Sequence, residues 1–293
     1  MNLLLFLLKE RMGKMKKNFD LEEAVRKRYS VRNYSDKQID EATRESIEAF
    51  ITSLDNPFGK EVNYHYLNIE DGGKGKRLGT YGVIKGAKEY IGTTIEEENL
   101  ALEALGYELE VLILYLASIG IGTCWLGGTF NRDSFAEAMN VGGELFPVIT
   151  PYGYPAERKH TKEAMMRKMI SADKRKSWEE LFFKENFGKS LSKEEAGDLE
   201  FLLEMVRLGP SASNKQPWRI VVDGKKCHFY EDREPGYSDR FPYDIQRIDM
   251  GIAAAHFELA AKEKGIKGSF KLDAQPSIDL PEHMYYLFTW IRD

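Results

Sequence analysis

Apolar positions recur along the chain at two spacings that predict helices and strands. Spacings of three and four residues place apolar side chains on one helical face, whereas strict alternation predicts a strand. Residues 99–120 form the strongest helical pattern, in which Leu102, Leu105, Leu109 and Leu112 repeat at helical spacing. This stretch is apolar on several sides, and such a helix is usually buried at the centre of a fold.

Shorter patterns complete two runs of elements. Asp20 is a typical N-cap, Asn56-Pro57 ends a helix, and Asp223-Gly224 is typical of a hairpin turn. The first run consists of helices at 21–28, 41–54 and 99–120, strands at 62–69 and 148–150, and a loop at 72–79 that contains several glycines. The second run consists of helices at 193–208 and 249–264, a hairpin at 219–231 and a strand at 285–291.

The two runs repeat one order, which predicts an internal duplication. Each has a helix, a Ser-x-x-Asn break (Ser53 to Asn56, and Ser211 to Asn214), a strand segment, a long apolar helix ending in Gly, and a closing strand. High charge density at 157–176 favours a linker between the halves. We therefore expect an N-terminal extension at 1–19, a first half at 20–160, a linker at 161–188 and a second half at 189–293, the halves together forming one intertwined unit.

Composition excludes several classes of protein. The 293 residues include 42 Lys+Arg and 47 Asp+Glu, so the net charge of -5 does not supply a basic nucleic-acid footprint. Cys124 and Cys227 form no C-x-x-C pair, and the five histidines form no H-E-x-x-H motif. The apolar run at residues 3–8 is too short to cross a bilayer and lacks the features of a signal peptide. We expect a cytoplasmic protein with neither a nucleic-acid nor a membrane partner.

A basic segment near the start has two interpretations. Arg26, Lys27, Arg28, Ser30 and Arg32 could form a solvated helix end, where cations suit the negative pole of the helix dipole. They could instead form an anion clamp, in which guanidinium and hydroxyl groups converge on a phosphate.

Two loop segments also have two possible interpretations each. Residues 209–218 could be an ordinary polar loop, or Ser211, Asn214 and Gln216 could bind the edge of a planar heterocycle with Trp218 as apolar support. Residues 120–128 contain four glycines, which suit a helix C-cap and turn but also allow a ligand to approach the backbone N–H groups.

Together these segments resemble the flavin-dependent nitroreductase family. The resemblance rests on R-Y-S-V-R at 28–32, G-I-G-T-C-W-L-G-G at 120–128, V-I-T-P-Y-G-Y-P at 148–155 and P-S-A-S-N-K-Q-P-W at 210–218, and it covers most of the chain from Asp20 onward. It implies a layered α+β fold, with a mainly antiparallel central sheet flanked by helices, and FMN held non-covalently. In the family, a homodimer builds its sites at the subunit interface.

The resemblance also assigns roles to individual residues. It implies that Arg28, Ser30 and Arg32 hold the phosphate, the ribityl chain and the polar ring edge. The other implied cofactor contacts are the backbone N–H groups of Gly127 and Gly128 near the reactive ring nitrogen, Trp125 beside them, Pro210, Ser211 and Asn214 from the opposing subunit, and Lys174 or Arg175 as a second phosphate contact.

The chain departs from the family pattern because its motifs are divided between the halves. The first half has the basic segment and the Gly-rich loop, but S-L-D-N-P-F stands where the family has P-S-x-x-N. The second half has P-S-A-S-N, but G-K-S-L-S-K stands where a basic clamp belongs. We therefore expect a monomeric single-chain pseudo-dimer that keeps one FMN site and has lost its symmetry mate.

The expected function is that of an FMN-dependent oxidoreductase. It would take a hydride from NADH or NADPH and reduce a small acceptor such as a nitroaromatic or a quinone, with no catalytic side chain required. Cys124 follows a buried helix and is expected to be a packed apolar residue rather than a nucleophile. The alternative is a flavin-binding or flavin-free protein that kept the fold without turnover.

Overall fold

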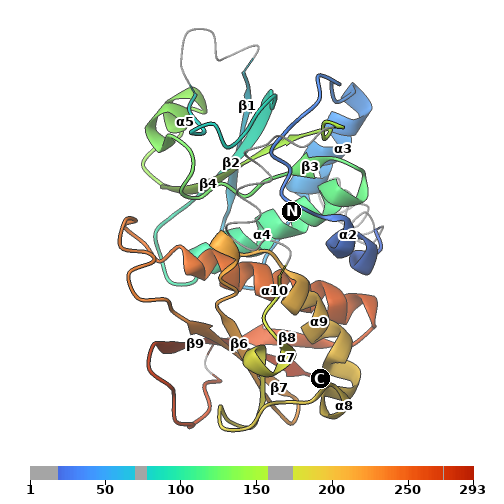
Figure 1. Ribbon diagram of the computed structural model, residues 1–293, viewed down its shortest axis with the longest axis vertical. Helices are drawn as coiled ribbons and strands as arrows, with labels where there is room; N and C mark the ends of the chain where they lie inside the picture. The colour runs from blue at the N-terminus through green and yellow to red at the C-terminus, as the bar shows by residue number, and fades with distance from the viewer. Residues whose placement is uncertain (1–18, 70–77, 158–173, 273) are drawn as a thin grey trace, which may run out of the picture. The chain divides into compact units, whose positions relative to one another are not determined.

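The computed structural model describes residues 19–69, 78–157, 174–272 and 274–293, which fall into two compact units (Figure 1). The first unit comprises Met1–Asn56, Glu61–Glu97 and Glu108–Met166, and the second comprises Pro57–Lys60, Glu98–Tyr107 and Arg167–Asp293, as far as these ranges are described. The units therefore interleave along the chain; the sequence analysis predicted two halves that together form one intertwined unit.

The described first unit is an antiparallel sheet with helices. Its strands are β1 (Asn63–Asn68), β2 (Glu89–Ile95), β3 (Gly122–Thr123) and β4 (Leu145–Gly153), in the order β1-β2-β4-β3. Its helices are α2 (Leu21–Lys27), α3 (Glu41–Thr52), α5 (Arg132–Ala138) and the larger part of α4 (Ala101–Ser118). A core of buried side chains, including Phe135 and Ile149, packs beside the sheet. The predicted helices at 21–28, 41–54 and 99–120 and both strands are confirmed.

The described second unit is a mixed sheet with helices. Its strand order is β5 (Phe182–Lys184), β6 (Trp218–Asp223), β7 (Lys226–Asp232), β9 (Met284–Arg292) and β8 (Gly268–Lys271), in which the β5–β6 pair is parallel and the others are antiparallel. Its helical elements are α7 (Trp178–Leu181), α8 (Lys193–Ala196), η1 (Gly197–Leu199), α9 (Glu200–Leu208), η2 (Ala212–Asn214) and α10 (Gln246–Glu263). The predicted hairpin, the final strand and the helix at 249–264 are confirmed, although α10 begins at Gln246.

Two expectations for the second unit need correction. Residues 178–184, which the sequence assigned to the linker, form α7 and β5 because Leu181 and Phe182 are fully buried in this unit. The predicted helix at 193–208 is divided, because Gly197 has a positive φ of 52° that ends α8 and separates it from α9. Residues 161–173 of the predicted linker, residues 72–77 of the predicted loop at 72–79, and residues 1–18 lie outside the described residues.

The two units repeat one topology. In each, a helix precedes two paired strands, a long helix follows, and a short strand precedes the closing strand. The sheet orders β1-β2-β4-β3 and β6-β7-β9-β8 are then equivalent position by position. This is the arrangement that an internal duplication predicts, and the expected fold of antiparallel sheets flanked by helices is confirmed.

Helix α4 supplies its first turns to the second unit, where they pack on α10. Gly251 of α10 lies so close to α4 that an added Cβ would overlap the carbonyl oxygen of Glu103, and Gly106 of α4 meets the carbonyl of Ile248 in the same way. The buried Glu103 carboxylate also pairs with Arg247 of α10. Glycines therefore allow the close helix approach that the ion pair accompanies.

Candidate functional site

The basic segment lies beside the strand that follows the long helix of the first unit. Asp20 caps α2 by accepting a hydrogen bond from the backbone N–H of Glu23, as predicted, and α2 ends before Arg28. Ser30 then forms a parallel bridge with Thr123, and the Val31 N–H donates to the Thr123 carbonyl at 2.8 Å. Two segments far apart in the sequence, 28–32 and 120–123, are thus brought together.

Arg32 holds a buried polar atom suited to a ligand. Its side chain is only 7% exposed, and one terminal nitrogen donates to the carbonyl of Ser30 at 3.4 Å. Its buried Nε has no hydrogen-bond acceptor among the described residues. Arg28 is half-buried and, with Lys27 and Gly120, lines a cavity of about 180 Å³. This combination of cations and a buried donor fits an anionic or hydrogen-bonding ligand better than a solvated helix end.

The Gly-rich loop at residues 120–128 is held by two side chains. The Trp125 indole N–H donates to the carboxylate of Glu110 at 2.8 Å, and Glu110 is fully buried on α4. The guanidinium of Arg132 donates to the carbonyl oxygen of Gly127 at 2.8 Å. Gly128, next in the chain, is exposed. The predicted N–H donors therefore lie in a fixed and accessible loop.

The P-S-x-x-N loop of the second unit carries backbone strain. Ser213, Asn214 and Gln216 have φ values of 49°, 58° and 51°, in the left-handed region that non-glycine residues rarely adopt. Pro210 and Ser211 precede them and are half-buried. Such strain persists only when surrounding interactions impose it, and it is concentrated at functional sites.

Side chains of the same loop impose this conformation. The Ser211 hydroxyl accepts a hydrogen bond from the Gln216 N–H at 2.8 Å, and the Gln216 amide donates to the Asn214 carbonyl at 3.1 Å. The Asn214 amide donates to the carbonyl of Lys174 at 3.0 Å. Gln216, 3% exposed, therefore serves the loop itself, so the structure does not favour the expectation that it binds the edge of a heterocycle.

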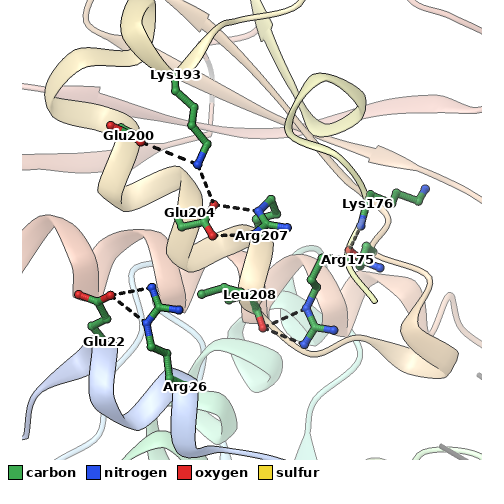
Figure 2. A network of polar contacts seen from close by, with 10 residues as sticks. Glu22, Arg26, Arg175, Lys176, Lys193, Glu200, Glu204, Arg207 and Leu208 are labelled. Atoms are coloured by element: carbon green, nitrogen blue, oxygen red, sulfur yellow. Dashed lines mark hydrogen bonds and ion pairs between the residues drawn. The ribbon is translucent and has the colours of Figure 1, made fainter. Parts of the chain in front are cut away.

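Arg175 contacts the last residue of α9, directly before this loop, as Figure 2 shows. Its guanidinium donates to the carbonyl of Leu208 at 3.1 and 3.3 Å and to that of Lys174 at 2.9 Å. The adjacent Lys176 N–H donates to the Gln216 side chain at 2.8 Å. These contacts favour a positioning role for Arg175 over the direct phosphate contact that the resemblance implies. The Lys174 side chain is exposed.

Two thiols and the carboxyl group of Glu231 are buried in the described residues. Cys124 and Cys227 are both buried and are not joined by a disulfide, and burial raises the pKa of Cys227 to about 12, which suits packing rather than nucleophilic chemistry. Glu231 on β7 is 1% exposed, and burial, reinforced by the neighbouring Asp244 carboxylate, raises its pKa to about 8. Sequence reasoning did not identify this acid, because nothing in a strand of alternating residues distinguishes it.

The sequence analysis also did not identify three polar residues that support the two loops. Glu110 and Arg132 hold the Gly-rich loop, and Asp249 accepts the Ala212 N–H of the P-S-x-x-N loop at 2.9 Å. Arg132 had one signal in the sequence, because a cation in the first turn of a helix opposes the helix dipole and needs another explanation.

The described residues contain no group of three or more His, Cys, Asp or Glu side chains placed to hold a metal ion. Within the same residues, every helix is too short or too polar to cross a membrane.

A family model described as "Putative TM nitroreductase" matches residues 20–261. No curated protein matches the chain. Among solved structures, a Thermotoga maritima protein described as a putative nitroreductase shares 22% identity over 93% of each chain, with a TM-score of 0.59.

Two shorter structures align with about half of this chain. An FMN-dependent nitroreductase from Clostridium difficile shares 17% identity with this chain. The alignment covers 50% of this chain and 95% of that protein, with a TM-score of 0.39. A nitroreductase with bound FMN from Bacteroides fragilis shares 19% identity, covers 49% of this chain and 92% of its own, and has a TM-score of 0.39.

Proposed function

The chain belongs to the nitroreductase family whose model matches residues 20–261, and from this premise we propose that it is an FMN-dependent oxidoreductase. The proposed electron donor is NADH or NADPH, and the proposed acceptor is a small molecule such as a nitroaromatic or a quinone. When bound, FMN supplies the hydride-accepting and electron-donating chemistry. The protein's part is to bind and orient the cofactor.

One observation supports this proposal most strongly. Arg32, in the basic segment that Ser30 joins to Thr123, has a buried Nε that finds no acceptor among the described residues. An unsatisfied buried donor costs about 1–3 kcal/mol, so its retention favours a ligand that accepts its hydrogen bond. The carbonyl groups and phosphate of FMN are acceptors of this kind, and the half-buried Arg28 offers a cation nearby in the chain.

The proposed cofactor contacts in the first unit are Arg28, Ser30, Arg32, Trp125, Gly127 and Gly128. Arg28 would neutralise the phosphate, Arg32 would donate to the polar ring edge, and the Gly128 N–H would donate to the flavin ring. Trp125 is fixed by Glu110 at 2.8 Å and so can present one constant surface to the cofactor.

The proposal extends to Pro210, Ser211 and Asn214 of the second unit, which the family resemblance assigns to flavin binding. The strained conformation of this loop supports their inclusion, because three left-handed residues are maintained there by side-chain hydrogen bonds. Lys174 remains a proposed phosphate contact, whereas we assign Arg175 to positioning the loop. A chain that supplies both sets of residues needs no second copy, so we propose a monomer in the cytoplasm, where NADH and NADPH are available.

Flavin binding is the first experiment. Purified protein is titrated with FMN while flavin absorbance and fluorescence are followed, and thermal unfolding is measured with and without FMN. We expect saturable binding and a higher unfolding temperature, because a ligand that binds only the folded state stabilises it. Protein that neither changes the flavin signals nor gains stability would contradict the proposal.

Turnover is the second experiment. FMN-loaded protein is mixed anaerobically with NADH or NADPH in a stopped-flow instrument, and the reduced protein is then mixed with a nitroaromatic or a quinone. We expect the flavin absorbance to be lost with the nicotinamide and to return with the acceptor. Binding without reduction by either nicotinamide would support the alternative, a flavin-binding protein without turnover.

A further inference from the structure

We propose that Arg132 is a positioning residue that orients the Gly127–Gly128 peptide toward the flavin ring, an inference that rests on the proposed function. Arg132 lies in the first turn of α5, whose N-cap Asn131 accepts the Ser134 N–H at 3.0 Å. Its guanidinium donates to three backbone carbonyls. The acceptors are Phe146 at 2.8 Å, Gly127 at 2.8 Å and Pro147 at 3.1 Å.

The three acceptors come from two segments that the guanidinium ties together. Gly127 belongs to the Gly-rich loop, whereas Phe146 and Pro147 belong to β4. The guanidinium also lies over the ring of Phe130, at 5.0 Å from the ring centroid. A planar guanidinium offers donors in fixed directions, so these contacts set the orientation of the Gly127 carbonyl as well as its position.

The orientation of this carbonyl determines where the next N–H points. In a trans peptide the C=O of one residue and the N–H of the next point in opposite directions, and no described peptide bond is cis. Because the Gly127 carbonyl points to Arg132, the Gly128 N–H points away from it. Gly128 is an exposed residue, so a ligand can approach this part of the loop.

Arg132 also strengthens this donor. A hydrogen bond to a peptide carbonyl polarises the amide, so the N–H of the same peptide donates more strongly. The reactive ring nitrogen, beside which the resemblance places this donor, accepts a hydrogen bond in oxidised FMN, whereas after taking up a hydride it carries its own hydrogen and donates instead. The Arg132–Gly127 contact therefore favours oxidised over reduced FMN, which is a property that simple support of the loop would not produce.

The test compares Arg132→Lys and Arg132→Gln with the wild type. Lysine keeps the charge but not the planar fork, and glutamine keeps hydrogen-bonding capacity without the charge. The matched control is Arg44→Lys, because Arg44 is also partly exposed and forms a paired contact with the Glu89 carboxylate in the same unit. Thermal unfolding identifies any variant that fails to fold.

The first readout needs no flavin. Amide hydrogen exchange is measured on flavin-free protein in peptides that cover residues 124–131. We expect faster exchange in both Arg132 variants than in the wild type and Arg44→Lys. Unchanged exchange would overturn the proposal, because the loop would then not depend on Arg132.

The second readout is the affinity for FMN in each oxidation state, from anaerobic titrations with oxidised and with reduced FMN. We expect Arg132→Gln to weaken binding of oxidised FMN about tenfold more than binding of reduced FMN, equivalent to about 30 mV for a two-electron couple. Arg132→Lys should show a smaller change in the same direction. An equal loss for both oxidation states would reduce Arg132 to a structural support and overturn the proposal. If the wild type itself binds no FMN, the proposed function is wrong, and the flavin part of this inference is wrong with it.

Discussion

Arginine side chains in this molecule differ in what their guanidinium groups contact. Arg132 and Arg175 each donate to backbone carbonyls beside a loop that carries a proposed cofactor contact. Arg32, by contrast, keeps a buried Nε that no described residue accepts. Arg132 and Arg175 therefore hold backbone in or beside the two loops, whereas Arg32 has a donor that a ligand could accept.

The first prediction concerns Arg28. Arg28→Ala should weaken FMN binding by about 10- to 100-fold, because a charge-assisted hydrogen bond contributes about 1.5–3 kcal/mol and each 1.4 kcal/mol is a factor of ten. Fluorescence titration with FMN measures the change. Arg26→Ala is the matched control, since Arg26 is an exposed residue paired with Glu22 one turn earlier. Equal affinity in Arg28→Ala and Arg26→Ala would contradict a phosphate role for Arg28.

A second prediction concerns the buried acid Glu231. Its pKa is raised from 4.5 to about 8 in the folded protein, chiefly by burial and also by Asp244, while Arg247 and Arg233 act in the opposite direction. Between these values the folded state binds a proton that the unfolded state has released, so stability falls as pH rises from about 4.5 to 8. The loss is on the order of a few kcal/mol, because each tenfold change in a dissociation constant is about 1.4 kcal/mol.

Glu231→Gln tests this prediction, because glutamine resembles the protonated acid. The free energy of unfolding is measured in urea at several pH values between 4.5 and 8. The variant should lose less stability than the wild type across that range and should be the more stable protein at pH 8. Glu234→Gln is the control, since Glu234 is a more exposed carboxylate paired with Lys215. Parallel stability curves for wild type and Glu231→Gln would exclude a raised pKa.

Among the helices and strands, those with a clear periodic pattern or turn residues could be predicted from the sequence. Helices α3 and α4 and the hairpin of β6 and β7 follow from apolar spacing and turn residues. Strand β2 was missed because all of Glu89–Ile95 is buried, so it shows no alternation, and because it contains Gly92, a residue type depleted in strands. The break at Gly197 and the parallel β5 depend on packing within the second unit, which local spacing does not encode.

The candidate site was predictable to a similar extent. Motifs located the basic segment and both loops, because their residue types have few other uses in that combination. The supporting residues Glu110, Arg132 and Asp249 were not found, because each lies in a helix away from the motif that it contacts. Their roles depend on which elements the fold brings together.

The third prediction concerns the packing of α10 on the first turns of α4. Gly251→Ala should destabilise the protein by about 1–3 kcal/mol or more, because its Cβ would overlap the backbone carbonyl of Glu103, which cannot rotate away. Urea unfolding measures the change. Gly142→Ala is the control, since an added Cβ at Gly142 meets nothing within 4 Å. A Gly251→Ala protein as stable as Gly142→Ala would show that the helices separate easily.

At the scale of the whole molecule, the two units share a topology but not their motifs. The first unit holds Arg28, Arg32 and the Gly-rich loop, and the second holds the strained loop of Ser211 and Asn214. Equivalent topology with complementary motifs is what a duplicated chain would retain if only one cofactor site were maintained. The proposed function therefore requires residues of both units, although each unit has its own sheet.

The last prediction tests this requirement directly. Asn214→Ala, in the second unit, should weaken FMN binding about tenfold or more, as Arg28→Ala does in the first, because both residues would serve the same cofactor. Lys215→Ala is the matched control, since Lys215 follows Asn214 in the loop but pairs with Glu234. Thermal unfolding of Asn214→Ala separates loss of the loop from loss of binding, because the Asn214 amide also donates to the Lys174 carbonyl.

Stoichiometry gives the same prediction a second measurement. Calorimetric titration should give one FMN per chain, and light scattering should give the mass of a monomer, because a single chain supplies every proposed contact. Two FMN per chain would mean that the divided motifs do not mark a lost site. A stable dimer whose FMN binding is lost on dilution would mean that a second copy supplies the contacts that we assign to the other unit, and the single-chain site would then be wrong.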